Sequence, residues 1–196
     1  MATTSNSDVG HFDRWARSYD RSVMQGLFFM PIHSQVLALL SRNGLNAPPA
    51  CIVDVGCGTG RLLRTASALW PKAELLGIDP AARMVAEASR LNPKATFKLA
   101  PAESLPLADR SADVIMSSMS FHHWSDQGKG IREISRVLRP GGLFCLADHS
   151  FTAFNLIGER ARSRAQVREL MAAAGLSVLV QKFAPLPFIL ITLARK

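Results

Sequence analysis

The stretch from Ile52 to Gly60 constrains the fold of this chain more than any other part of the sequence. A short apolar run leads into a loop with glycine at every second position, and an amphipathic helical pattern follows at once. Glycine permits positive φ and lets a ligand approach the backbone closely. The start of the helix offers N–H groups and partial positive charge to an anionic group. The predicted order is strand, glycine turn and helix, and the helix has one apolar face of Leu62, Leu63, Ala66, Leu69 and Trp70.

The next strand ends in an acid at a spacing typical of nucleoside-binding units. The apolar run from Glu74 to Ile78 is followed by Asp79, which lies about 20 residues beyond the glycines. At that distance, a second strand brings a carboxylate to a ribose hydroxyl. The unit therefore predicts a site for a nucleoside with a negatively charged tail.

The glycine spacing separates two kinds of nucleoside. A nicotinamide dinucleotide fingerprint reads G-x-G-x-x-G, whereas residues 56–60 read G-x-G-x-G and follow an acid, Asp54. The string V-D-V-G-C-G-T-G at 53–60, with G-I-D-P at 77–80, resembles motifs of class I S-adenosylmethionine (SAM)-dependent methyltransferases. SAM ends in an amino acid, so an acid for its ammonium and N–H groups for its carboxylate suit it. The spacing argues against the alternative of a nicotinamide-dependent oxidoreductase.

The N-terminal segment carries a second resemblance. F-D-R-W-A-R-S-Y-D at 12–20 is similar to the opening of methyltransferases that include the ubiquinone and menaquinone biosynthesis enzymes. In such enzymes this segment folds over the cofactor, which implies that Tyr19 lies close to it. A plain core aromatic is the alternative for Tyr19.

A third resemblance concerns the adenine. P-A-E-S-L-P-L at 101–107 resembles a D-A-E-x-L-P-F loop of the family, which holds the adenine. Pro101 stands where the family has aspartate, and one side-chain contact is lost. Adenine recognition is then expected to depend on backbone groups around Ala102 and Glu103.

The resemblance implies SAM as the cofactor and S-adenosylhomocysteine as its product. Asp79 is expected to bind the ribose hydroxyls, and Asp54 to face the ammonium directly or through water. Cys57 is expected to be a small side chain beside the cofactor, not a nucleophile. Met84 and Ala102 are expected to enclose the adenine. The complete predicted set is Tyr19, Asp54, Gly56, Cys57, Gly58, Gly60, Asp79, Pro80, Met84, Ala102, Glu103 and Ser118.

Histidines are the candidates for chemistry on the substrate side. His122 and His123 lie in S-M-S-F-H-H-W at 118–124, which resembles the family's loop beside the methionine part of SAM and the acceptor. Histidine titrates near neutral pH and could act as a base towards a hydroxyl or an acidic carbon. We expect this pair on the substrate side; His149 is a further candidate, and packing or surface roles are the alternative. No metal site is predicted, because no third ligand has a convincing spacing.

The alternation of elements predicts an α/β fold with a single doubly wound, mostly parallel seven-stranded sheet, Rossmann-like, with an antiparallel C-terminal hairpin strand at the edge and N-terminal helices. Residues 1–10 are expected to be a disordered tail, and 11–196 a single domain in which 11–46 form a helical cap. Expected strands are 52–55, 74–78, 95–99, 112–117, 143–147, 176–183 and 188–194, and expected helices include 11–20, 30–41, 81–91, 127–138 and 160–174.

Composition limits the cellular setting and the partners. The chain has 196 residues, 48% of them hydrophobic, which fits one domain with a substantial core. Its three cysteines show no paired or metal-ligand spacing and are interpreted as reduced thiols in a cytoplasmic protein. No apolar run approaches the roughly 20 residues that span a membrane. The net charge of +8 favours anionic substrates, nucleic acid or an anionic membrane surface.

The predicted function is methyl transfer to a small-molecule or lipid-like acceptor, with peripheral membrane contact left open and the oligomeric state not predicted. An RNA methyltransferase is one alternative. Against it, the sequence shows no added RNA-binding module and no interleaving of aromatic and basic residues. A SAM-binding protein without catalysis is another, because of Pro101 and the short stretch from Asp148 to Arg160. Arginines recur every four residues and form either a solvated row or an anion-attracting one: Arg160, Arg164 and Arg168.

Overall fold

The computed structural model describes residues 29–43, 47–150, 161–184 and 188–196. The predicted tail at 1–10, the helix at 11–20 and Tyr19 lie outside these described residues. The expectation that residues 11–196 form one domain with a cap at 11–46 stays a prediction.

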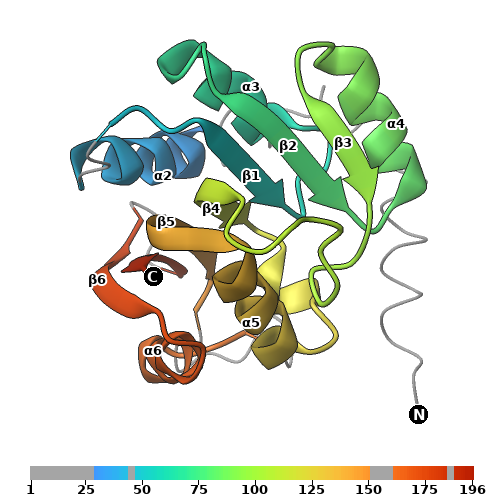
Figure 1. The fold of residues 1–196 in the computed structure, drawn as a ribbon. Coiled ribbons are helices and arrows are strands. Elements are labelled where there is room, and N and C mark those ends of the chain that lie inside the picture. Colours follow the sequence, from blue (N-terminus) through green and yellow to red (C-terminus); the bar gives the residue numbers. More distant parts are fainter. Residues whose placement is uncertain (1–28, 44–46, 151–160, 185–187) are drawn as a thin grey trace.

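Seven strands form one sheet in the order β3-β2-β1-β4-β5-β7-β6 (Figure 1). Strands β1 to β5 pair in parallel, and β7 is antiparallel to both of its neighbours. This confirms the predicted α/β Rossmann-like class. The strands are β1 Cys51–Val55, β2 Glu74–Asp79, β3 Thr96–Leu99, β4 Ala112–Ser118, β5 Leu138–His149, β6 Ser177–Phe183 and β7 Ile189–Arg195.

The antiparallel strand lies inside the sheet, whereas the sequence predicted it at the edge. Strand β7 lies between β5 and β6, and β6 is the edge strand. The burial explains the order, because six consecutive residues of β7 from Ile189 are buried whereas β6 has no fully buried residue. A strand buried on both faces belongs inside a sheet, and a partly exposed strand suits its edge.

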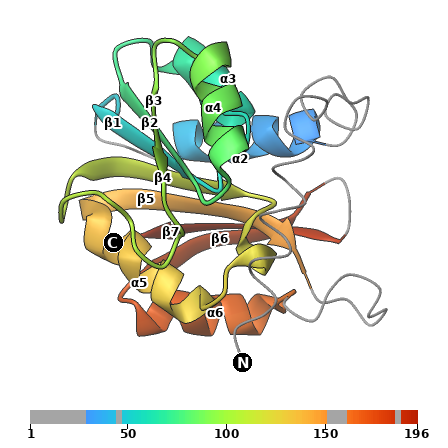
Figure 2. The same ribbon diagram turned by 90° about the vertical axis from the view of Figure 1, so that its right-hand side faces the viewer.

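Helices cover both faces of the sheet. In Figure 2, α2, α3 and α4 lie on one side of the strands, and α5 and α6 lie on the other. Each face has its own apolar core, one around Leu40 and Leu63 and the other around Ile131 and Met171. The helices are α2 Met30–Arg42, α3 Arg61–Leu69, α4 Ala82–Leu91, α5 Gln127–Val137 and α6 Arg164–Ala173, with a short 3₁₀ helix η2 at Phe121–His123.

The boundaries of α6 and β5 differ most from the sequence prediction. Helix α6 begins at Arg164 and not at residue 160, because Ser163 caps it: the Ser163 hydroxyl accepts from the Gln166 amide, and the Gln166 side chain accepts from the Ser163 amide. Helix α5 ends at Val137, and β5 already begins at Leu138.

Individual side chains also depart from the prediction. Leu69, expected on the buried face of its helix, is 52% exposed because α3 ends there. Of the predicted arginine row, Arg160 lies outside the described residues. Arg164 and Arg168 both donate hydrogen bonds to Gln181 of β6, so these two tie α6 to the edge strand.

Among the described residues, no helix combines the length and apolar character needed to cross a bilayer.

Candidate cofactor and acceptor site

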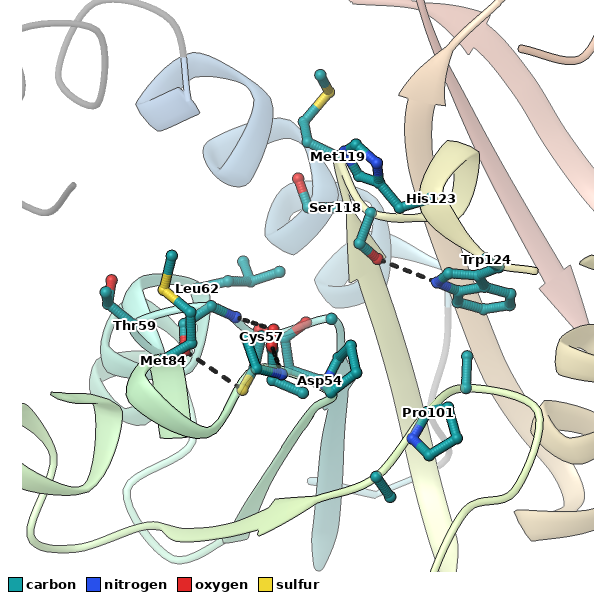
Figure 3. A pocket seen from close by; sticks show the side chains of 18 of the residues that line it. Asp54, Cys57, Thr59, Leu62, Met84, Pro101, Ser118, Met119, His123 and Trp124 are labelled. Atoms are coloured by element: carbon teal, nitrogen blue, oxygen red, sulfur yellow. Dashed lines mark hydrogen bonds between the residues drawn. The ribbon is translucent and has the colours of Figure 1, made fainter. Parts of the chain in front are cut away.

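A cavity of about 380 Å³ lies where the carboxyl ends of β1, β2 and β4 meet. Open α/β sheets place their ligands at this edge, and the volume falls within the usual range for small-molecule sites. The fold thus brings eleven predicted residues to one cavity (Figure 3): Asp54, Gly56, Cys57, Gly58, Asp79, Pro80, Met84, Ala102, Glu103, Ser118 and His123.

The three glycines of the loop differ in what surrounds them, although all have positive φ. A Cβ on Gly58 would meet nothing within 4 Å, so this backbone faces open space in the cavity wall. A Cβ on Gly56 would lie 2.2 Å from the Ser120 hydroxyl oxygen. Gly60 is not among the lining residues, and a Cβ there would press on Phe97. Gly58 is thus placed to face a ligand, while Gly60 has a packing role in the structure.

Asp79 at the end of β2 is held by backbone amides. One carboxylate oxygen accepts from the Gly58 amide at 2.8 Å, and the other accepts from the Ala81 amide at 2.9 Å. The residue is 8% exposed and lines the cavity. Each carboxylate oxygen has more than one acceptor direction, so the group can accept hydroxyl donors while it keeps both amides.

Asp54 is the second acid of the cavity and is 2% exposed. Burial, with a smaller contribution from the nearby Asp79 charge, raises the pKa of Asp54 to about 8. A cation at this wall would reverse that shift, because an opposite charge favours the ionised carboxylate. The site therefore suits a ligand that carries an ammonium, as SAM does.

Cys57 is buried beside both acids. Burial first, and then the charges of Asp79 and Asp54, raise the pKa of its thiol well above the usual value. A thiol is nucleophilic only as thiolate, so this cysteine is unsuited to attack. Its small size matters more, because a Cβ on Gly77 would already lie 2.9 Å from the Cys57 sulfur.

The wall expected to hold the adenine is mainly apolar. Met84 is buried on α4, and Ala100, Pro101 and Ala102 lie on the cavity wall. Glu103 accepts a hydrogen bond from the Asp126 amide at 3.0 Å, which ties this wall to the start of α5. The wall therefore has a fixed apolar surface in place of the missing aspartate side chain.

The following residues of this loop are fixed by one arginine. Arg136 of α5 donates to the Leu105 and Leu107 carbonyl oxygens and to the Asp109 carboxylate. The same guanidinium pairs with Glu133 at 2.7 Å, and Glu133 accepts from the Leu105 amide. These bonds hold the segment after the adenine wall against α5.

Part of the cavity wall was not predicted from the sequence. His33 of α2 is buried there, and burial, followed by the charges of Arg61 and Arg64, lowers its pKa to about 4. The apolar period of α2 placed the helix correctly, but it carried no signal that a histidine on its buried face would reach the cavity. Met119, Ser120 and Trp124 lie in the 118–124 loop predicted beside SAM, and Pro101 lies in the predicted adenine loop, although none was in the predicted set. The remaining lining residues are Phe29, Thr59, Arg61, Leu62, Ala81, Ala100 and Ser125.

The two predicted substrate-side histidines take different places. His123 lines the cavity, across from Cys57 and Met84 in Figure 3. His122 is not among the lining residues, and its Nδ1 lies 2.6 Å from a carboxylate oxygen of Asp148. The two imidazole rings are 3.9 Å apart between centroids. His122 therefore stands behind His123, against the end of β5.

Asp148 is the centre of a cluster that the sequence did not reveal. Its carboxylate accepts from the His122 amide at 3.1 Å and from the His149 amide at 2.6 Å. Burial lowers the pKa of His149, and the Asp148 charge partly opposes that shift. The absence of a metal site was predicted for want of a third ligand. The pairing of β4 with β5 brings His149 to within ligand distance of His122 and Asp148.

Known methyltransferases match this chain in sequence. Residues 53–146 match a family model described as a methyltransferase domain. The chain is 41% identical over 101 residues to malonyl-[acyl-carrier protein] O-methyltransferase of Methylococcus capsulatus, covering 50% of this chain and 37% of that one. It is 38% identical over 101 residues to trans-aconitate 2-methyltransferase of Pseudomonas aeruginosa, covering 52% and 36% respectively. The chain thus spans little more than a third of the length of these two curated relatives.

Solved structures agree on the fold. The structure of a SAM-dependent methyltransferase from Aquifex aeolicus matches with a TM-score of 0.76 at 21% identity, over 93% of this chain and 97% of that one. At that identity the likeness concerns the fold alone. The family match at 53–146 marks this part of the chain as similar to methyltransferase domains, and the sheet order gives it a Rossmann-like fold.

Proposed function

We propose that this protein transfers a methyl group from SAM to a small-molecule or lipid-like acceptor, and releases S-adenosylhomocysteine. The observation that carries the proposal is the pair of buried acids, Asp54 and Asp79, that line one cavity together with the open backbone of Gly58. Such a pair suits a ligand with a cationic amine at one point and neutral hydroxyl donors at another. A dinucleotide would bring a pyrophosphate to the same wall, where two acids oppose it.

In this proposal, different residues of the cavity bind different parts of SAM. Asp79 accepts from the ribose hydroxyls, and its two backbone amide bonds fix its orientation beforehand. Asp54 faces the ammonium, and the Gly58 backbone borders the methionine end. The apolar wall of Met84 and Ala102 encloses the adenine. Tyr19 and Gly60 remain sequence predictions, the first outside the described residues and the second away from the cavity wall.

When bound, SAM supplies a methyl group already activated by its sulfonium, so the protein needs no nucleophile of its own. The chain's contribution is to exclude water and hold the acceptor in line, and positioning of this kind can supply about 7–11 kcal/mol of a barrier. His123 lines the cavity on the acceptor side and can take a proton where the acceptor is a hydroxyl or an acidic carbon.

The acceptor class follows from the relatives and from the cavity. The two relatives described above are named for malonyl-[acyl-carrier protein] and trans-aconitate. For this chain the broad class is an acceptor that presents a small reacting group to the part of the cavity lined by His123 and Trp124.

Isothermal titration calorimetry tests the proposal directly. SAM and S-adenosylhomocysteine should each bind at one site per chain, and NAD⁺ should give no heat under the same conditions. NAD⁺ binding without SAM binding would restore the oxidoreductase hypothesis. Binding of both sulfur compounds without methyl transfer to any of a panel of small acids, lipid-like acceptors and RNA would favour a binding protein without catalysis.

A further inference from the structure

The cluster at the ends of β4 and β5 has a geometry that the proposed methyl transfer does not use. One ligating atom from each of His122, Asp148 and His149 can be chosen so that no two lie more than 4.8 Å apart. The Asp148 carboxylate is buried, and two backbone amides fix it in place. The ring centroids of His122 and His149 are 5.0 Å apart, nearly perpendicular to each other.

His149 gives an independent sign of a missing partner. Its Nδ1 is buried and has no hydrogen-bond partner among the described residues. A buried polar atom without a partner costs about 1–3 kcal/mol, so each instance in a folded protein calls for a ligand, ion or water to explain it. The ring of Phe188 lies beside that of His149 and nearly parallel to it, with centroids 6.1 Å apart and planes within 17°.

We propose that His122, Asp148 and His149 form a binding site for a divalent transition-metal ion of the zinc type. Two imidazole nitrogens and one carboxylate oxygen are donors that such ions prefer, whereas Mg²⁺ prefers oxygen alone. Three protein ligands leave coordination positions open for an outside oxygen. Ligand atoms around one such ion lie roughly 3.0–3.5 Å apart, between the 2.6 Å of the His122–Asp148 pair and the 4.8 Å limit of the cluster. Side-chain adjustments of about an ångström therefore assemble the site.

In a simpler interpretation, His122 is a proton acceptor that the Asp148 carboxylate orients. The 2.6 Å contact between His122 and Asp148 would serve that purpose. It leaves the buried nitrogen of His149 unexplained, and it does not account for three donors converging on one point. An ion accounts for all three residues.

The place of the cluster assigns the ion a task, and this step rests on the proposed function. His122 stands directly behind His123, which lines the cavity on the acceptor side. None of the three ligands is among the residues that line the cavity, so the ion would meet an acceptor hydroxyl that reaches past His123. It would lower the pKa of that hydroxyl and favour loss of its proton to solvent, acting as a Lewis acid without any change of oxidation state. The acceptor class is then narrowed to molecules that offer a hydroxyl oxygen.

The test uses the full chain with any affinity tag removed and the metal alone. Co²⁺ is titrated with visible absorption as the readout, Zn²⁺ by calorimetry, and Mg²⁺ serves as the comparison ion. We expect one Co²⁺ or Zn²⁺ per chain and no measurable heat with Mg²⁺. Asp148→Asn and His149→Ala should each weaken Zn²⁺ binding at least about tenfold.

His33→Gln is the matched control, because it removes a buried histidine outside the cluster. It should leave Zn²⁺ affinity unchanged. Thermal unfolding shows whether each variant is folded, and if Asp148→Asn does not fold, His149→Ala decides the matter alone.

Three results would overturn the metal site. The first is no Co²⁺ binding by the wild-type chain. The second is binding that survives both ligand substitutions. The third is the strong near-ultraviolet charge-transfer band of a cobalt–thiolate, which would place the ion on a cysteine. S-adenosylhomocysteine affinity is measured on the same samples, so failure of the metal site is distinguished from failure of the proposed function.

Discussion

The Asp79 carboxylate accepts a hydrogen bond from the Gly58 amide at 2.8 Å, which joins the end of β2 to the glycine loop 21 residues earlier in the chain. The bond fixes the acid and the open backbone of the loop relative to each other before any ligand arrives. The acid and the glycine loop of the proposed SAM site are therefore held in a fixed arrangement by this hydrogen bond.

Asp79→Ala should weaken SAM binding at least about tenfold, because a hydrogen bond to a charged group contributes about 1.5–3 kcal/mol. Loss of the Gly58 contact adds to the effect by loosening the loop. Calorimetry with SAM provides the measurement, and Glu169→Ala, which removes an exposed acid from α6, is the control. Unchanged affinity in Asp79→Ala would remove the ribose assignment.

Alanine at Gly56 should mainly affect stability, whereas alanine at Gly58 should mainly affect SAM binding. Both positions have positive φ, which costs an alanine about 1–2 kcal/mol. Gly56→Ala also pushes a Cβ to 2.2 Å from the Ser120 hydroxyl oxygen, so it should lower the unfolding free energy further than Gly58→Ala does. Gly58→Ala, whose Cβ enters open space in the cavity wall, should mainly lower SAM affinity.

The double variant Gly56→Ala/Ser120→Gly tests the physical cause. Removing the Ser120 side chain should recover part of the stability lost in Gly56→Ala, as measured by urea unfolding. If the double variant loses as much stability as the two single variants together, the clash is not the source of the destabilisation.

The capping box at the start of α6 should be worth a measurable amount of stability. Ser163→Ala removes the hydroxyl that accepts from the Gln166 amide, and it should lower the unfolding free energy by about 1 kcal/mol. SAM affinity should not change, because Ser163 is not among the residues of the cavity wall. Ser163→Asp restores a capping acceptor and should recover most of the loss; equal stability of all three proteins would show that the cap contributes nothing.

The sequence predicted those parts of the site that depend on a strand and the few residues after it. Asp54, the glycine loop and Asp79 are of this kind, because a strand end fixes their place through local spacing alone. Gly60 shows the limit of that reasoning. It belongs to the same pattern as Gly56 and Gly58, but a Cβ there would meet Phe97 of β3, so packing, not the cavity, surrounds it.

Features that depend on pairing between distant segments could not be predicted. His122 meets Asp148 because Ser118 of β4 pairs with Ala147 of β5, and no local pattern specifies that register. The same holds for the start of β5. The sequence R-P-G-G at 139–142 predicts a break between the helix and the strand. In the structure β5 pairs with β4 before and after these residues, with Leu138 opposite Ala112 and Leu143 opposite Val114.

The ionisation of Asp54 should make the protein without ligand less stable as the pH rises. Its pKa is raised to about 8 in the folded state, against about 4 when unfolded. The folded state therefore holds this proton more tightly, and stability falls as the pH climbs from about 4 towards about 8. Asp54→Asn removes the dependence, so its stability relative to wild type should improve by at least about 1.4 kcal/mol between about pH 5 and about pH 8.

Urea unfolding of both proteins at the two pH values gives the comparison. The sign of the change matters more than its size, since other groups titrate equally in wild type and variant. A difference between the two proteins that stays constant with pH would mean that Asp54 is already ionised in the folded protein.

SAM binding should release a proton if Asp54 faces the ammonium. Near pH 7 the raised pKa keeps this carboxyl largely protonated without ligand, and a bound cation favours its ionised form. Up to about one proton should therefore leave per SAM bound. Calorimetry in phosphate and in Tris, whose ionisation enthalpies differ, should give different heats for wild type and matching heats for Asp54→Asn. Matching heats for wild type in the two buffers would place the ammonium away from Asp54, and the loop would then bind the methionine end without this acid.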